Sequence, residues 1–366
     1  MTSVRPEIGD FLDRHIAAGD FPGAVFLIAE DDRIVAEGWK GFAVREPESI
    51  PMQRDTIFDL SSLTKPLATM LLTALLEQEG RVRLTDRVCD HLPGFTGEDR
   101  QGILLEDLLL HRAGLPAWVP LYVDGGGGEE AVRRLLRLPL SSPPGTRVEY
   151  CCPGFILLGE VVQRTTGRNL RDLFEQEVAV PLGLADTGFL PPATRRRRIA
   201  ATETGNLWER KMAGGAGAGF SGWRQDLIWG EVHDGNAHAL GGISGNAGLF
   251  STAADIARLS REFLGTGTGL LSSEWRQRFS RNWTGGLGED RSPGWQLAST
   301  PDCAAHGSLP GESFGHTGFT GVSLWVEPAR NRQYLFLTNR VHPEVRPIAM
   351  NSIRREFHRL ARKVLE

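Results

Sequence analysis

A serine and a lysine three residues apart are the residues whose types and spacing point most directly to covalent chemistry. Ser62 and Lys65 begin and end a four-residue segment with the pattern S-x-x-K, just before an apolar run. This separation places the hydroxyl and the amine on one helical face, within hydrogen-bonding reach. A serine becomes a good nucleophile when a neighbour takes its proton, and an amine can do so when its pKa is lowered. Ser62 is therefore the candidate nucleophile and Lys65 the candidate proton acceptor.

Lysine is scarce in this chain, which favours a specific role for Lys65. Lys and Arg together number 41, yet the other lysines are only Lys40, Lys211 and Lys363. Because arginine does not release its proton inside a protein, only lysine suits a proton acceptor. The segment is also compatible with a structural role, in which the serine caps a helix and the lysine stem packs along its surface.

Tyr150 is a second candidate for proton transfer. It follows the turn-forming segment 141–145 and precedes an expected helix, so its phenol can project from a loop. A phenol held near a cation can pass protons between partners. The alternative is a half-buried ring with one satisfied hydroxyl.

A third segment, His316-Thr317-Gly318, comes directly before an expected strand at 322–326. An edge strand at this place would present backbone N–H groups to a carbonyl oxygen. The alternative is an exposed histidine in a glycine-rich bend.

Taken in chain order, these three segments resemble the serine β-lactamases and penicillin-binding proteins. That superfamily has S-x-x-K, then Tyr-x-Asn or a variant, then Lys-Thr-Gly or His-Thr-Gly. The likeness covers about residues 8–360, looks closest to the class C β-lactamase, esterase and D-aminopeptidase branch, and includes 108–116, 181–187 and 248–256. Residues 232–237 and 240–242 resemble a subgroup that includes amidases acting on cell-wall muropeptides.

The resemblance implies a mechanism. Ser62 attacks a carbonyl, Lys65 and Tyr150 exchange its proton with the leaving group, and water releases the acyl group from Ser62. The oxyanion is expected on the backbone N–H groups of Ser62 and Phe319, the residue just after the third motif. His316, Thr317, Gly318 and Cys152 are expected on the substrate side of the site. No metal or organic cofactor is implied.

Two positions depart from the family pattern. Cys152 stands where the family commonly has Asn or Asp, and a thiol is a weak donor and acceptor. His316 stands in place of lysine, which weakens the permanent positive charge because neutral imidazole is substantial at pH 7. Both changes argue against efficient penicillin turnover.

The leading hypothesis is therefore hydrolysis of an ester or amide, with a peptide-like, D-amino-acid or muropeptide-like substrate. A catalytically silent penicillin-fold protein that binds or senses a ligand is one alternative, motivated by Cys152. A true class C-type β-lactamase is another. The sequence does not decide which of Lys65 and Tyr150 is the acylation base, nor does it indicate an oligomeric state.

The expected elements place these residues in an α+β fold. Residues 24–29 with 33–37, and 322–326 with 333–337, have the apolar and β-branched character of two hairpins, and 348–364 has the spacing of an amphipathic helix. Between them, helices are expected at 67–79, 104–110, 129–136 and 156–164. We expect an antiparallel sheet from both chain ends, with 1–82 and 235–366 forming the sheet subdomain and 83–234 a mainly helical insertion.

Composition excludes several classes of protein. The 366 residues are 40% hydrophobic and 23% charged, which is typical of a globular chain. A net charge of −4 gives no general attraction for nucleic acid, and the arginine run 195–198 is interpreted as a solvated loop or helix end. No stretch approaches the roughly 20 apolar residues of a membrane span. The first twenty residues lack the pattern of a secretory signal, so a cytoplasmic location is expected.

The remaining polar and glycine-rich features are given structural interpretations. The four cysteines are expected to be reduced and mostly buried. His111 is expected to be a scaffold histidine, and His233, Asp234 and His238 a structural hydrogen-bond cluster more than pocket residues. The glycine-rich stretches 125–128 and 213–222 lack the ending of a phosphate-binding loop and are expected to be flexible loops.

Overall fold

An eight-stranded antiparallel sheet, built from both ends of the chain, organises the molecule. In this computed structural model, which describes residues 6–125 and 127–366, the strand order is β3-β2-β1-β11-β10-β9-β8-β7. The strands are β1 (Gly23–Glu30), β2 (Arg33–Val44), β3 (Ile50–Pro51), β7 (Arg291–Ser292), β8 (Trp295–Leu297), β9 (Phe314–Thr317), β10 (Ser323–Glu327) and β11 (Arg332–Thr338). The predicted α+β class, with its sheet from both chain ends, is confirmed.

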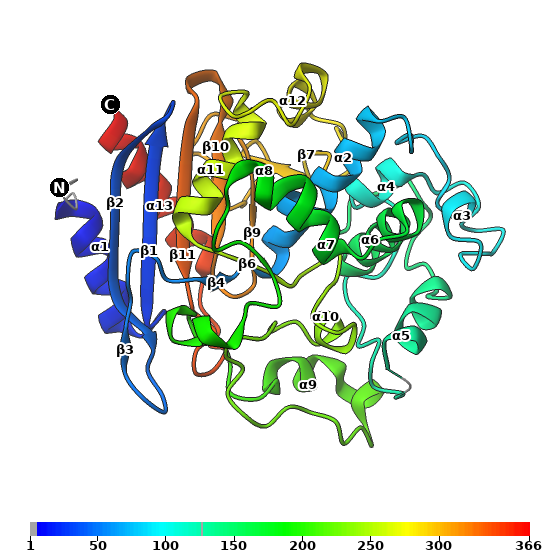
Figure 1. Cartoon of the computed structure of the whole chain (residues 1–366), viewed down its shortest axis with the longest axis horizontal. Coiled ribbons are helices and arrows are strands. Elements are labelled where there is room, and N and C mark those ends of the chain that lie inside the picture. Colours follow the sequence, from blue (N-terminus) through cyan, green and yellow to red (C-terminus); the bar gives the residue numbers. More distant parts are fainter. Residues whose placement is uncertain (1–5, 126) are drawn as a thin grey trace.

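Helices cover both faces of the sheet (Figure 1). On one face lie α1 (Pro6–Ala18) and α13 (Met350–Leu365), and on the other lies α11 (Ala253–Leu264) with the rest of the helical part. Strand β1 is buried on both sides: Phe26 belongs to the core under α1 and α13, whereas Leu27 belongs to the larger core on the helical side. Burial on both faces explains why this segment is continuously apolar instead of alternating.

The middle of the chain is mainly helical, as expected, and is drawn to the right of the sheet in Figure 1. It contains α2 (Leu71–Gln78), α3 (Val88–His91), α4 (Leu105–Leu109), α5 (Gly127–Leu136), α6 (Cys152–Thr166), α7 (Leu170–Phe174), α8 (Val180–Leu182), α9 (Leu207–Ala213), α10 (Gly235–Ala239) and, further along the chain, α12 (Ser273–Phe279). A small sheet of β4 (Phe58–Asp59), β6 (Leu249–Ser251) and β5 (Gly188–Phe189) joins this part to the segment before Ser62. The division into 1–82 with 235–366 and 83–234 remains a prediction.

Several local expectations need correction. His316 and Thr317 lie within β9 and not in a bend. Strand β8 pairs with β9 only at Phe314 and Gly315, so β9 is an inner strand at its start and has no β8 partner at His316 and Thr317. Helix α6 begins at Cys152, where Pro153 in the first turn suits a helix start. In the stretch 125–128, residue 126 lies outside the described residues and 127–128 open α5, while 214–217 form a short 3-10 turn.

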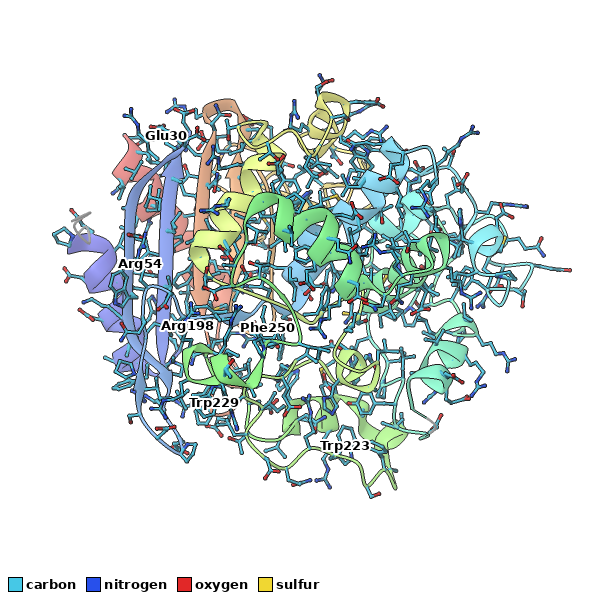
Figure 2. All side chains as sticks on the ribbon, viewed as in Figure 1. Glu30, Arg54, Arg198, Trp223, Trp229 and Phe250 are labelled. Carbon is cyan, nitrogen blue, oxygen red and sulfur yellow. The ribbon has the colours of Figure 1, made fainter. Side chains whose placement is uncertain are left out.

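The arginine run 195–198 is occupied by contacts within the protein. It forms the last turns of a 3-10 helix, and Arg198, labelled in Figure 2, pairs with Asp186 at 2.7 Å and with Asp55 at 2.9 Å. The Arg196 guanidinium lies 4.5 Å from the ring centre of Trp229, also labelled there. The run is thus a helix end, as interpreted from the sequence, and the guanidinium groups of Arg196 and Arg198 contact an aromatic ring and carboxylates of the protein itself.

Two further expectations can be checked against the described residues. The cysteines are free thiols, of which Cys151, Cys152 and Cys303 are buried and Cys89 is partly exposed. Among the described helices, none has the length and apolar character needed to cross a bilayer.

Candidate active site

The candidate nucleophile lies where a short strand turns into a helix. After β4, a 3-10 turn (Ser61–Leu63) and a π-helical stretch (Lys65–Met70) lead directly into α2. The buried Asp59 carboxylate accepts the Ser61 N–H at 2.8 Å, and Ser61 has the positive φ of 47° that is uncommon outside glycine. Wide π-turns recur at functional sites, and this one begins at Lys65.

Lys65 is fully buried and its amine has three hydrogen-bond partners. Nζ lies 2.9 Å from Ser62 Oγ, 3.6 Å from Cys152 Sγ and 3.2 Å from the backbone oxygen of Asn246. An ammonium group has three protons to donate, so this set of partners suits the charged amine. The expected pairing of Ser62 with Lys65 is thus present in the structure.

The pKa of Lys65 is raised, contrary to the expected lowering. Burial favours the neutral amine, but the negative charges that Cys152, Tyr150 and Asp234 carry once they ionise outweigh burial. Asp234 is linked to the site because it accepts a hydrogen bond from the Asn246 side chain at 3.2 Å. Lys65 therefore carries its proton in the free protein at neutral pH.

Tyr150 lies in the loop before α6, with cations near its ring. Lys65 Nζ is 5.0 Å and the Arg291 guanidinium 5.5 Å from the ring centre, and the rings of His111 and His316 pack at 4.6 and 5.7 Å. The phenol Oη is buried and has no hydrogen-bond partner of ordinary distance and angle among the described residues. Burial raises the pKa of Tyr150, although Lys65 opposes that rise. The free protein thus holds a neutral phenol beside an ammonium.

The third motif brings its backbone against the segment of the nucleophile. The Phe319 N–H donates to Ser61 Oγ at 3.2 Å. Gly318 cannot carry a side chain here, since a Cβ would lie 2.6 Å from the Leu60 oxygen and 2.5 Å from Val322 Cγ2. The sequence analysis missed Ser61, although its position next to Ser62 was a signal for it.

The neutral imidazole of His316, expected to be substantial at pH 7, is the form that the structure favours. Burial lowers its pKa well below the usual value, and the positive charges of Lys65 and Arg291 lower it further. Its Nδ1 lies 2.8 Å from the Thr317 carbonyl, so Nδ1 carries the proton and donates it there. The third motif thus supplies no positive charge.

A cavity of about 350 Å³ joins these groups and has a mixed polar lining. Ser62, Tyr150, His316, Thr317, Gly318 and Phe319 line it together with Glu289, Arg291, Arg340 and Arg354. Cys152, which was expected on the substrate side, contacts Lys65 Nζ at 3.6 Å instead and is not among the lining residues of this cavity. The three arginines were not predicted, because Arg291 lies in β7, Arg340 follows β11 and Arg354 lies in α13, far apart in the sequence. The one signal in the sequence was the place of Arg354, three residues before Phe357 in an amphipathic helix.

The other histidines singled out in the sequence have supporting roles. His111 accepts the Cys151 N–H at 3.0 Å, which places it behind Tyr150 as a scaffold residue. His233 is buried, pairs with Glu203 at 2.9 Å and stacks on the Phe319 ring at 5.6 Å. His238 lies 3.4 Å from Glu231 and is half-exposed. His233 thus belongs to a structural cluster, as expected.

No metal centre accompanies this site within the described ranges 6–125 and 127–366. Those residues contain no group of three or more His, Cys, Asp or Glu side chains placed to bind a metal ion.

Comparisons with known proteins agree over nearly the whole chain. The β-lactamase family model matches residues 9–358. An N-acetylmuramyl-L-alanine amidase of Bacillus subtilis is 31% identical, with 93% of this chain and 81% of the relative covered. A putative D-alanyl-D-alanine carboxypeptidase of Escherichia coli is also 31% identical, with 89% and 80% covered. A penicillin-binding protein homologue from Caulobacter crescentus has the same fold, with a TM-score of 0.73, 22% identity, and 98% and 99% covered.

Proposed function

Because the chain belongs to the β-lactamase family and is a serine hydrolase, we propose that it hydrolyses an ester or amide through an acyl-enzyme on Ser62. The observation that carries this proposal is the 2.9 Å hydrogen bond between Lys65 Nζ and Ser62 Oγ, at a cavity that Tyr150 also lines. An alcohol, a buried amine and a phenol at one place are the groups needed to move a serine proton during acyl transfer.

The Lys65 and Tyr150 pair is the proposed proton carrier. In the free protein the pair holds both of its protons, so the reactive form is the minor one that has lost a proton. In that form, the pair takes the Ser62 proton as Oγ attacks the carbonyl, and returns it to the leaving group as the acyl-enzyme forms. Water then attacks the acyl carbon while the same pair takes one of its protons. The bond between Ser62 Oγ and the acyl carbon breaks, the pair returns the proton to Oγ, and the acid is released.

The backbone N–H groups of Ser62 and Phe319 are the proposed oxyanion donors. The Phe319 N–H donates to the hydroxyl oxygen of Ser61, next to the nucleophile, and Phe319 lines the same cavity as Ser62; both observations support this assignment. In other enzymes a single donor of this kind contributes roughly 3 to 4 kcal/mol to the transition state.

The proposed substrate is a peptide-like, D-amino-acid or muropeptide-like acyl compound. Two relatives at 31% identity have names that refer to amide bonds, one in an N-acetylmuramyl-L-alanine unit and one in D-alanyl-D-alanine. A neutral His316 in place of a cation disfavours a β-lactam, whose carboxylate the family's lysine would hold. A chromogenic cephalosporin is therefore expected to be hydrolysed far more slowly than a D-amino-acid amide or a muramyl peptide.

Labelling with a fluorophosphonate tests the nucleophile. Intact mass spectrometry is expected to find one adduct on the wild-type protein and none on Ser62→Ala. An adduct that persists in Ser62→Ala would reject Ser62 as the nucleophile.

The silent binding protein is the second candidate, because Cys152 gives the amine a weak partner where the family has an amide or carboxylate. A panel of nitrophenyl esters, D-amino-acid amides and muramyl peptides distinguishes the two. Turnover that is lost in Lys65→Ala supports the hydrolase; stoichiometric acylation of Ser62 without turnover supports the binding protein.

A further inference from the structure

Arg354 is a buried cation that donates two hydrogen bonds to backbone carbonyls and one to a side-chain amide. It is 5% exposed, and no carboxylate of the described residues pairs with it. Nη2 donates to the Gly318 and Val322 oxygens, each at 3.0 Å, while Nη1 donates to the Asn351 side chain. Burial lowers the pKa of Arg354 to about 9. Burying a charge without a counter-ion is unfavourable, so its position here needs another explanation.

The Gly318 carbonyl belongs to the peptide unit whose N–H is that of Phe319. The peptide group is conjugated, so a positive charge on its oxygen draws electron density from the nitrogen. Hydrogen bonds arranged in such a chain strengthen one another, by about 10–30% per bond. A guanidinium on this oxygen therefore makes the Phe319 N–H a stronger donor at the other end of the same group.

Arg354 also fixes the turn that carries this peptide. The Gly318 N–H donates to the Val322 oxygen at 2.8 Å, and Arg354 donates to that same oxygen. The guanidinium thus holds both ends of the turn and leaves the Phe319 N–H directed at Ser61 Oγ.

We propose that Arg354 is a positioning residue that strengthens the oxyanion donor Phe319 N–H through the Gly318 carbonyl. This inference rests on the proposed acyl-enzyme function. It predicts that Arg354 acts on the bound carbonyl without touching it, so its removal slows acylation and leaves substrate affinity largely intact.

The carbonyl stretch of the acyl-enzyme is the readout, because its frequency falls as hydrogen bonding to the carbonyl oxygen becomes stronger. A slowly hydrolysed nitrophenyl ester traps the acyl group on Ser62 for infrared difference spectroscopy, and stopped-flow release of nitrophenol gives the acylation rate. For Arg354→Gln, we expect a band at higher frequency, a limiting acylation rate slower by about tenfold, and a dissociation constant for the ester, taken from the concentration dependence of the acylation rate, within twofold of the wild type; complete loss of a donor costs about 100- to 1000-fold in other enzymes.

Three further variants make the result specific. Arg354→Lys keeps a charge and is expected to recover part of the frequency and rate, and it carries the test if Arg354→Gln does not fold. Arg355→Gln alters the neighbouring arginine, which donates to the carbonyls of Asp302 and Cys303 instead, and is expected to leave the band unchanged. Arg340→Gln removes a cation that donates to the Phe319 oxygen, one peptide further on, and is expected to shift the band less than Arg354→Gln does.

Each other outcome counts against the inference. An unchanged band and rate in Arg354→Gln would overturn it, as would an equal shift in Arg340→Gln or Arg355→Gln. A raised dissociation constant for the ester with an unchanged limiting acylation rate would mean that Arg354 contacts substrate directly, which also overturns it. If the wild-type protein forms no acyl-enzyme, the proposed function fails first; this result is distinct because it appears before any arginine is changed.

Discussion

The Lys65 amine lies 3.6 Å from the Cys152 thiol, with both groups buried beside Ser62. The thiol is a weak acceptor for this amine, and burial raises the pKa of Cys152, which keeps it neutral near pH 7. Lys65 is therefore held mainly by Ser62 Oγ and by the Asn246 carbonyl. A side chain at position 152 with stronger hydrogen-bonding groups would therefore hold the Lys65 amine more firmly.

Cys152→Asn is expected to raise turnover of a D-amino-acid amide several-fold. The amide would accept from the Lys65 ammonium and also donate to the neutral amine, so it would orient the amine toward Ser62 Oγ in both protonation states, which the thiol does only weakly. Steady-state kcat/KM for the amide is the measurement, with Cys303→Asn as a control at another buried thiol. A fall of more than tenfold in Cys152→Asn, with an unchanged melting temperature, would contradict the expectation.

The pH dependence of kcat/KM is expected to have a single rising limb that reaches its plateau only at alkaline pH. The pKa values of Lys65 and Tyr150 are both raised, so the pair that has lost one proton is scarce at pH 7. Below the lower apparent pKa, the rate should therefore rise about tenfold per pH unit, and that pKa belongs to the coupled pair. A plateau that already begins below pH 6 would show that another group accepts the proton.

Much of this site follows from spacing along the chain, whereas its electrostatics do not. The S-x-x-K spacing alone places Ser62 and Lys65 on one helical turn, which the structure bears out. The raised pKa of Lys65 depends on Cys152 and Asp234, which lie 87 and 169 residues further along the chain. A local pattern cannot report the balance between burial and such distant groups.

The fold shows the same contrast between local and distant signals. The hairpin of β1 and β2 was predictable because two apolar runs flank a short acidic turn. Strands β7 and β8 have only two and three residues, so they show no periodicity of their own. They are strands because β7 pairs with β8 and β8 pairs with β9 at Phe314 and Gly315, and no local pattern in the sequence indicates that pairing.

Gly318→Ala is expected to reduce activity at least 100-fold and to destabilise the protein by about 1–3 kcal/mol, typical of overpacking. The added methyl group would meet the Leu60 oxygen and the Val322 side chain, which pushes the Phe319 N–H away from Ser62. Gly188→Ala is the matched control, because a Cβ there meets nothing within 4 Å. Thermal unfolding and kcat/KM measure the two effects. Equal melting temperatures and equal kcat/KM in the two variants would show that the turn at Gly318 accommodates a methyl group, which would contradict the prediction.

Ser61→Ala is expected to accelerate acylation by about 2- to 13-fold. In the free protein, the Phe319 N–H is engaged by Ser61 Oγ at 3.2 Å, so a substrate oxyanion must replace that bond before it gains the donor. A neutral hydrogen bond of this kind contributes about 0.5–1.5 kcal/mol, which sets the size of the effect. Stopped-flow acylation with a nitrophenyl ester measures it.

Ser61→Gly should give the same acceleration and also a higher melting temperature, because glycine accepts the φ of 47° without strain. Slower acylation in both variants would instead mean that the Ser61 hydroxyl donates to the oxyanion.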